Sequence, residues 1–241
     1  MILSHGYLCR AQIATDAYLR ICLSHKVLGM EISMKIIAAT GNKGKLEEIA
    51  RILDPAEFEL ISMKETGFDR EVKENGTSYE ENALIKVKAV REYLDDIGYP
   101  GEYLVIADDS GLEVDYLNGC PGIFSARYMG EDTPYTVKNR AIVDALKNVP
   151  DEKRSARFIC AIAVMYPDRS TQTVRGVYEG LVSREIKGTY GFGYDPMFFV
   201  PKFGVTDAEL PPEVKNRVSH RAQALRLAEK NIKLWLTKHD V

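Results

Sequence analysis

The chain is poor in the residues that build thiolate and histidine metal sites. Its 241 residues include four cysteines and four histidines, with no CxxC pair and no HExxH motif. This scarcity argues against a thiolate zinc site and against a histidine-based metal centre. The cysteines are expected to behave as reduced, small hydrophobic residues, as in a cytoplasmic protein.

The sequence also lacks long apolar runs and a strong excess of charge. No stretch approaches the roughly 20 apolar residues that a membrane-spanning helix needs, so no membrane association is expected. The formal net charge is −3, which gives no basis for binding nucleic acid through a broad basic surface. A small anionic ligand held by a few local cations remains compatible with this charge, and an apolar fraction of 45% permits a sizeable core.

The first 33 residues differ in composition from the rest of the chain. They contain few acidic residues and two of the four cysteines, and polar residues interrupt their apolar stretches. No signal-peptide pattern forms. Residues 1–33 are interpreted either as an appended or mis-called leader, with Met34 as the natural start, or as an additional N-terminal helix. Residues 34–241 are expected to form a single domain.

Periodicity predicts an α/β fold with a mixed β-sheet flanked by helices. Apolar residues at helical spacing over 45–53 predict one helix, and Ser78 begins a capping-box pattern that predicts another. Strands and helices alternate in the first half, whereas strands follow one another in the second. The expected strands are 35–40, 58–62, 104–107, 112–116, 156–166 and 171–179, and the further expected helices are 134–149 and one capped by Ser219.

Two adjacent carboxylates, Asp108 and Asp109, follow the apolar run 104–107. Ser110 and Gly111 then predict a turn that ends the strand. Neighbouring carboxylates repel, so holding both ionised takes a cation or strong hydrogen-bond donors. The pair therefore favours a metal-assisted site. The alternative is a plain turn in which one aspartate bonds local backbone, which would explain one acid but not two.

Glu74 is the acid best placed to complete such a site. Glu80 and Glu81 are explained as first-turn charges that the helix dipole favours, whereas Glu74 precedes that turn. Mg²⁺ prefers oxygen ligands and commonly takes one or two carboxylates together with substrate phosphate. A solvated loop charge is the alternative.

A glycine-containing turn between the first strand and the first helix could bind an anion. Free backbone N–H groups and the positive helix end attract a phosphate there, and a lysine can add a charge. The spacing is not that of a Walker A loop, and an ordinary strand–helix turn is equally compatible. The segment is Thr40-Gly41-Asn42-Lys43-Gly44-Lys45.

Two further segments carry aromatic and basic residues. Gly188–Pro196 is rich in glycine and aromatic residues, and Phe192 could stack on a nucleobase unless the aromatics pack inward. Residues 215–221 place three or four cations at the expected start of the last helix. The helix dipole disfavours cations there, so an anion is expected among them, although a basic surface run is the alternative.

Taken together and in order, these segments resemble the Ham1/inosine triphosphate pyrophosphatase family from about Met34 to Leu236. The resemblance implies Mg²⁺-dependent hydrolysis of ITP, dITP and XTP to the monophosphate and pyrophosphate. It also implies an elongated fold with a cleft between two lobes, a single catalytic domain over 34–241, and a homodimer. The motifs that carry it are Thr40-Gly41-Asn42 with Lys45, Glu74 with 78–83, 107–112, Pro121-Gly122 with 125–128, 191–196 and Ser219-His220-Arg221.

The resemblance also implies roles for individual residues. Asp109 would accept a proton from water and contact the metal, Glu74 would hold metal, and Asp108 would either help hold metal or be a structural turn acid. The substrate would contact Thr40, Gly41, Asn42, Lys43, Gly44, Lys45, Ser110, Phe192, Gly193, Tyr194, Asp195, Lys215, His220 and Arg221. Two alternatives remain open: a Maf-like pyrophosphatase acting on other modified nucleotides, and a non-catalytic nucleotide-binding module.

Overall fold

The computed structural model describes residues 33–239. The expectation for an N-terminal extension over residues 1–33 therefore lies almost entirely outside the described residues. The described chain forms strands and helices in the order β1 (Met34–Ala38), α2 (Lys43–Ile52), β2 (Phe58–Ser62), α3 (Tyr79–Asp96), β3 (Tyr103–Val114), α4 (Tyr135–Ala145), β4 (Ser155–Met165), β5 (Thr171–Val182), β6 (Phe198–Val200), β7 (Val205–Thr206), α5 (Pro212–Val218) and α6 (His220–His239). Short 3₁₀ helices include η2 (Gly122–Phe124), η4 (Asp195–Met197) and η5 (Asp207–Glu209).

The strands form one seven-stranded sheet in the order β2-β1-β3-β4-β5-β6-β7. The pairs β1–β2 and β1–β3 are parallel, and every pair from β3–β4 to β6–β7 is antiparallel. The parallel part is built by strand–helix alternation in the first half of the chain, and the antiparallel part by consecutive strands in the second. The predicted mixed α/β fold is confirmed.

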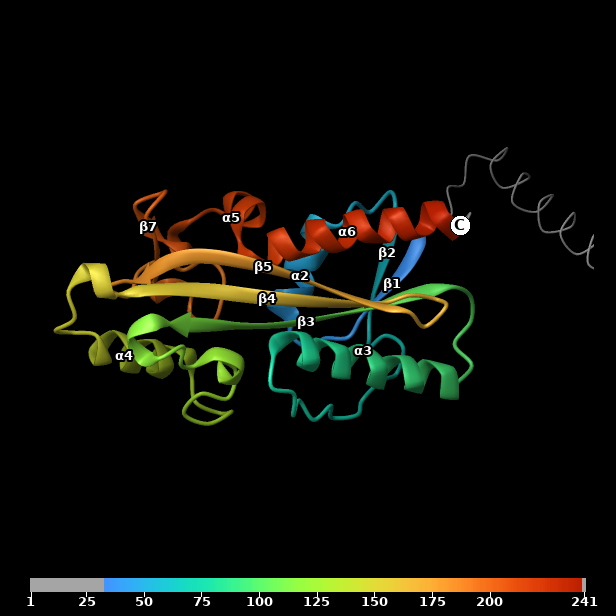
Figure 1. The fold of residues 1–241 in the computed structure, drawn as a ribbon, viewed down its shortest axis with the longest axis horizontal. Coiled ribbons are helices and arrows are strands. Elements are labelled where there is room, and N and C mark those ends of the chain that lie inside the picture. Colours follow the sequence, from blue (N-terminus) through green and yellow to red (C-terminus); the bar gives the residue numbers. More distant parts are fainter. Residues whose placement is uncertain (1–32, 240–241) are drawn as a thin grey trace, which may run out of the picture.

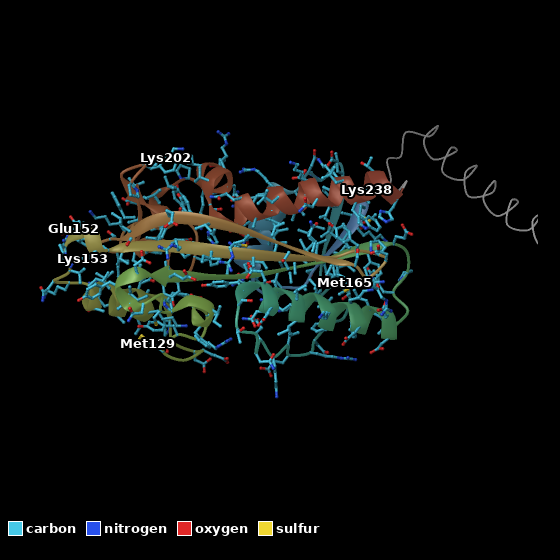
Figure 2. The ribbon with its side chains drawn as sticks, viewed as in Figure 1. Met129, Glu152, Lys153, Met165, Lys202 and Lys238 are labelled. Atoms are coloured by element: carbon cyan, nitrogen blue, oxygen red, sulfur yellow. The ribbon has the colours of Figure 1, made fainter. Side chains whose placement is uncertain are left out.

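The long strands β3, β4 and β5 run along the whole length of an elongated molecule, with α6 on one side of the sheet and α3 and α4 on the other (Figure 1). Figure 2 shows the extent of β4, because Lys153, just before the strand, and Met165, its last residue, lie toward opposite ends. Apolar cores lie at both ends. Near β1, apolar side chains of α6 pack against one face of the sheet and those of α3 against the other. Near β6, a separate apolar core contains residues of α4 and η4.

Two side-chain caps begin the helices that border the functional region. The Asn42 side chain accepts a hydrogen bond from Lys45 N at 3.1 Å and starts α2. Ser78 Oγ accepts from Glu81 N at 3.2 Å and starts α3, as predicted. The Glu81 side chain accepts a hydrogen bond from Thr77 N. In a standard capping box this side chain would accept from the N–H of the cap residue, here Ser78, so the second bond of the box is displaced by one residue.

The predicted turn at Ser110-Gly111 is wrong, and so is the return strand over 112–116. β3 continues through both residues and pairs with β4 from Val105 opposite Met165 to Val114 opposite Ala156. A side chain at position 111 would clash with the carbonyl oxygen of Gly122. Gly111 is thus required by the close approach of η2 to the strand and not by a turn.

The basic run over 215–221 spans two helices, not the start of one. Lys215 lies in the last turn of α5, where the helix dipole favours a cation. The chain breaks at Ser219, whose Oγ accepts from Ala222 N at 3.2 Å and begins α6. Ser219 is thus the predicted cap, but the helix before it was not foreseen. Within residues 33–239, no helix is both long and apolar enough to cross a membrane.

Candidate active site

A cleft of about 700 Å³ opens where β1 ends and β3 continues. The pairing of β1 with β3 stops at Ala38, opposite Ile106, after which the chain turns into α2. β3 therefore loses its parallel neighbour just before Asp108. The predicted site residues that line the cleft are Thr40, Gly41, Asn42, Lys45, Glu74, Asp109, Ser110, Phe192, Gly193, Tyr194, Asp195, Lys215, His220 and Arg221; Lys43, Gly44 and Asp108 do not line it.

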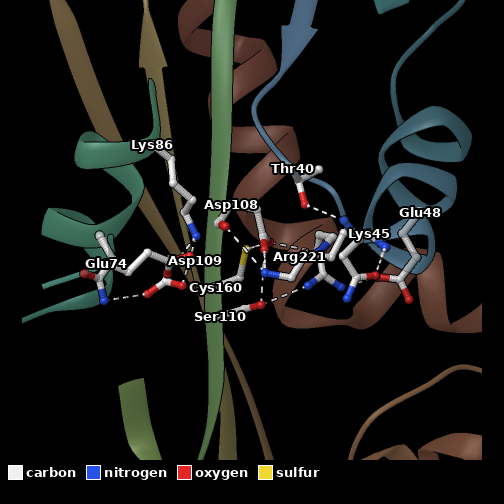
Figure 3. A network of polar contacts seen from close by, with 12 residues as sticks. Thr40, Lys45, Glu48, Glu74, Lys86, Asp108, Asp109, Ser110, Cys160 and Arg221 are labelled. Carbon is white, nitrogen blue, oxygen red and sulfur yellow. Dashed lines mark hydrogen bonds and ion pairs between the residues drawn. The ribbon is translucent and has the colours of Figure 1, made fainter. Parts of the chain in front are cut away.

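Asp109 points toward α3 and meets a lysine and an amide there. Lys86 Nζ lies 3.2 Å from Asp109 Oδ1 and 3.1 Å from Glu74 Oε2, so two carboxylates converge on one ammonium (Figure 3). Asn82 Nδ2 donates to Asp109 Oδ2 at 3.3 Å. Asn82 and Lys86 are four residues apart and thus share one face of the helix.

Burial raises the pKa of Asp109, although the nearby Lys86 and Lys45 ammonium groups partly counteract this effect. Burial would also lower the pKa of Lys86, but the Asp109 and Glu74 carboxylates outweigh it and raise that pKa. Lys86 therefore stays charged. A carboxylate whose pKa is raised toward neutrality is a better proton acceptor than an ordinary aspartate.

Asp108 points to the opposite face of β3 and is fully enclosed. Its carboxylate accepts from Arg221 Nε at 2.9 Å and from Cys160 Sγ at 2.8 Å, and it forms an ion pair with Lys45 (Figure 3). Ser110 Oγ donates to the same carboxylate at 3.2 Å. Burial would raise the pKa of Asp108, but Arg221 and Lys45 hold it well below its usual range. These partners occupy its oxygens, which speaks against a metal-ligand role and favours a structural one.

Two cations of the basic run over 215–221, Lys215 and Arg221, are neutralised by the protein's own carboxylates. Lys215 Nζ lies 2.5 Å from Asp195 Oδ2, 3.2 Å from Glu48 Oε1 and 3.3 Å from Asp207 Oδ2. Arg221 pairs with Glu48 as well as with Asp108. The expectation that these cations require an anion is thus met by buried acids, which the sequence does not reveal.

Phe192, in the glycine-rich loop, packs close to both of these cations. Lys215 Nζ and the Arg221 guanidinium carbon lie 5.3 and 5.6 Å from its ring centroid, and the backbone N–H of Phe192 donates to Asp195 Oδ2 at 2.7 Å. Its ring also rests against Gly44. The aromatic face therefore borders both the cation cluster and the start of α2.

Tyr194 and His220 are buried against other aromatic rings. Tyr194 is buried, and its hydroxyl donates to Ser125 O at 2.8 Å. For this residue the structure therefore agrees with the alternative prediction, in which the aromatic residues of the loop pack inward. His220 stacks on Phe158 with ring centroids 4.8 Å apart. Burial and the neighbouring Arg221 hold the pKa of His220 well below its usual range, so the imidazole is neutral. Its Nδ1 has no hydrogen-bond partner among residues 33–239.

Sequence reasoning missed Lys86, Asn82 and Glu48. A signal for the first two was present, because both lie on the face of α3 that carries Ala83, Val87 and Val90. Polar side chains at helical spacing within an apolar stripe indicate buried polar contacts. Glu48 offers no such signal, since its partners Lys215 and Arg221 are distant in the sequence.

The donor set at Asp109 fits a magnesium ion that is shared with substrate. No group of three or more histidine, cysteine or acidic side chains within residues 33–239 is arranged to hold a metal by itself. Glu74 and Asp109 nevertheless present hard carboxylate oxygens close to each other, both within 3.2 Å of Lys86 Nζ. Two carboxylates completed by phosphate oxygens and water are a usual set for Mg²⁺.

Comparison with known proteins gives consistent matches over most of the chain. Residues 36–231 match the model of the Ham1 family. The dITP/XTP pyrophosphatase of Desulforamulus reducens is 45% identical over 195 residues, covering 81% of this chain and 94% of that protein. The dITP/XTP pyrophosphatase of Bacillus subtilis is 43% identical over 201 residues, covering 83% and 98%.

Solved structures agree with the sequence matches. The Staphylococcus aureus Ham1 protein has a TM-score of 0.71 and 37% identity, with 83% of this chain and 98% of that chain covered. A nucleoside-triphosphatase, dITP/XTP pyrophosphatase, from Mycobacterium abscessus has a TM-score of 0.61 and 40% identity, with 81% and 98% covered.

Proposed function

Since this chain belongs to the Ham1 family, we propose that it hydrolyses dITP, XTP and ITP to the nucleoside monophosphate and pyrophosphate. It is a nucleoside triphosphate pyrophosphatase, and the relatives from Desulforamulus reducens and Bacillus subtilis are dITP/XTP pyrophosphatases. Such an activity removes non-canonical purine nucleotides from the nucleotide pool. Residues 34–241 form the catalytic domain in this proposal.

The observation that carries the proposal is the convergence of Asp109 and Glu74 on Lys86 at the floor of the cleft. Asp109 has a raised pKa and is the group in this cluster suited to accept a proton from the attacking water. Glu74 and Asp109 are the residues that would hold Mg²⁺. The ion would supply electrophilic stabilisation of the charge that develops on the phosphate oxygens.

Phosphate binding is assigned to the start of α2, which lines the same cleft as this cluster. Thr40, Gly41 and Asn42 line the cleft where the positive end of the helix lies, and Lys45 adds an ammonium group. Lys86 stays charged and faces the same space. A triphosphate placed between these groups would present its phosphates to the water that Asp109 orients.

Base binding is assigned to Phe192, Lys215 and His220. The Phe192 ring provides a stacking face, and the neutral His220 has one ring nitrogen without a partner. A 6-oxo purine accepts a hydrogen bond where adenine presents an amino group. A donor held at that position therefore rejects adenine by leaving a polar group unpaired.

A substrate panel tests this function. Pyrophosphate release should be rapid with dITP, XTP and ITP in the presence of Mg²⁺, and slow with dATP and dTTP. Preferential release from modified pyrimidine or methylated nucleotides would instead identify a Maf-like enzyme. Nucleotide binding without any release would identify a binding module.

Assembly and location extend the same proposal. We infer a homodimer and a cytoplasmic protein, in keeping with the family resemblance and with cysteines suited to a reducing compartment. Sedimentation velocity of the purified full chain tests the dimer. A single species with the mass of one chain at micromolar concentration would contradict it.

A further inference from the structure

Asp207 is a fully buried carboxylate behind the base-binding corner of the cleft. It begins the short helix η5 after Thr206, and its exposed fraction is 0%. Neither of its carboxylate oxygens has a hydrogen-bond partner within the described residues, and its one ion pair is with Lys215, at 3.3 Å. A buried ionised carboxylate with so few contacts is costly, so a specific reason for its presence is needed.

The groups that face Asp207 come from three elements. Lys215 reaches it from α5, Asp195 lies beside it from η4, and the Tyr178 hydroxyl approaches it from β5. Glu48, from α2, binds the same ammonium on another side. Three carboxylates therefore share one lysine, and one of those carboxylates, Glu48, is also bound by Arg221.

This arrangement favours keeping one proton on the cluster. Asp195 lies at 2.5 Å from Lys215 and also accepts the Phe192 N–H, whereas Asp207 has the longest of the three lysine contacts. Burial, and then the neighbouring Asp195 carboxylate, raise the pKa of Asp207 to about 7. Asp207 is thus the member of the cluster that gains and loses a proton near neutral pH.

We propose that Asp207 is a positioning residue that controls, through its protonation, how firmly Lys215 holds Asp195 and the Phe192 loop, and so how well the enzyme binds an acidic purine base. When Asp207 is neutral, the Lys215 ammonium forms ion pairs with Asp195 and Glu48 only. When it is ionised, it competes for the same ammonium and adds a negative charge behind the base. This inference rests on the proposed function and extends it to discrimination between substrates.

Binding of xanthine and of hypoxanthine should respond differently to the negative charge of ionised Asp207. Xanthine has a second oxo group and loses a ring proton more readily than hypoxanthine, so XTP carries a more negative base at alkaline pH. A negative charge behind the base then opposes XTP more than dITP. The effect should appear in KM and not in kcat, because Asp207 contacts neither Asp109 nor Lys86.

The test compares Asp207→Asn with the wild-type full chain between about pH 6 and pH 8.5, using XTP and dITP with saturating Mg²⁺. For each substrate, kcat/KM of the variant is divided by that of the wild type, which cancels the ionisation of the substrate itself. This ratio of kcat/KM values, variant over wild type, should be near one at low pH and rise with pH. The expected rise is about tenfold for XTP, which corresponds to an interaction free energy of one pKa unit, and smaller for dITP. The kcat quotient should stay flat.

Glu209→Gln is the matched control. Glu209 lies in the same short helix and caps Thr206, but its carboxylate is exposed and does not reach Lys215. It should keep the wild-type pH profile for both substrates. A change in Glu209→Gln equal to that in Asp207→Asn would mean that only the folding of η5 matters, and would overturn the inference.

A second measurement needs no variant. In the wild type, KM for XTP should rise from pH 6 to 8.5 more steeply than KM for dITP, beyond the change that free XTP titration accounts for. Parallel profiles for the two substrates, with hydrolysis of both, would refute the role of Asp207 and leave the proposed function intact. Absence of hydrolysis of either substrate would overturn the proposed function and this inference with it.

Discussion

The carboxylates of Asp108 and Asp109 lie on opposite faces of β3, although the residues are adjacent. Asp109 meets Lys86 of α3, and Asp108 meets Arg221 of α6 (Figure 3). Successive side chains of a strand alternate between faces, so a continuous strand must separate them. One feature of the sequence thus contains two sites, with a candidate base on one face and a buried ion-pair network on the other.

Replacing Asp109 with asparagine tests the candidate base. Asp109→Asn keeps the size of the side chain and can keep the contact with Asn82, but it cannot accept a proton from water. At saturating Mg²⁺ we expect kcat for dITP to fall by about 10²–10⁴-fold, the range of general base catalysis, and the Kd of the nucleotide to change by much less. Single-turnover pyrophosphate release and equilibrium binding measure the two effects. A variant with undiminished kcat would remove Asp109 from the mechanism.

Replacing Asp108 with asparagine should instead affect stability. The change takes from the buried Arg221 one of its two carboxylate partners and leaves the partly buried Lys45 without Asp108, and breaking a buried pair costs about 3–5 kcal/mol. Urea unfolding at neutral pH measures the loss. Asp144→Asn is the matched control, since Asp144 is exposed and lies 3.9 Å from Arg140; its effect should stay within about 0.5 kcal/mol. Equal midpoints for the two variants would contradict the structural role of Asp108.

Local patterns predicted much of the fold because the interactions behind them are local. The strand over 58–62, the hairpin formed by β4 and β5, and the caps Ser78 and Ser219 all depend on periodicity or on contacts within a few residues. The failure at Ser110-Gly111 has the opposite cause. The reason for Gly111 is the backbone of Gly122 from another element, which no local pattern contains.

The candidate site was predicted unevenly for the same reason. Motifs located the cleft at Thr40–Asn42, Lys45, Asp109 and Phe192. They did not locate Glu48, because its role comes from Lys215 and Arg221, which the fold brings from the far end of the chain. The basic run consequently appeared to need an external anion. Buried ion pairs between distant segments are visible only once the segments are packed.

The buried Asp207 should make the protein less stable as pH rises. Its pKa is about 7 in the folded chain and is near 4 in an unfolded chain. Between these values the folded state binds more protons, so the free energy of unfolding falls with increasing pH and levels off above about pH 7. Asp207→Asn has no such ionisation and should be more stable than the wild type by up to about 4 kcal/mol at alkaline pH, since each pKa unit corresponds to about 1.4 kcal/mol. Urea denaturation at about pH 5 and pH 8.5 checks the difference, and a gap that does not widen with pH would contradict it.

Glu74 should determine the affinity for Mg²⁺. Its carboxylate is only partly buried and contacts Lys86 at 3.1 Å, so Glu74→Gln should fold normally. We expect the Mg²⁺ concentration for half-maximal activity to rise by about tenfold or more, since loss of even a residue that supports a metal ligand typically weakens metal affinity by about 10–100-fold, with kcat partly restored at high Mg²⁺. Glu81→Gln serves as the control, because Glu81 caps the start of α3 without reaching Asp109. An identical Mg²⁺ dependence in wild type and Glu74→Gln would exclude Glu74 as a ligand.

Gly44 should affect substrate binding because it leaves room for the Phe192 ring, and not because of its own backbone conformation. A Cβ at position 44 would lie 2.7 Å from Phe192 Cδ1, so Gly44→Ala must displace the ring. The helix itself should gain up to about 1 kcal/mol from alanine. We therefore expect an unchanged or raised melting temperature together with a KM for dITP that rises several-fold. In a Phe192→Ala background the KM cost of Gly44→Ala should disappear, because the clashing ring is absent. If the cost persists in the double variant, the glycine acts on the phosphates directly, and the contact with Phe192 is incidental.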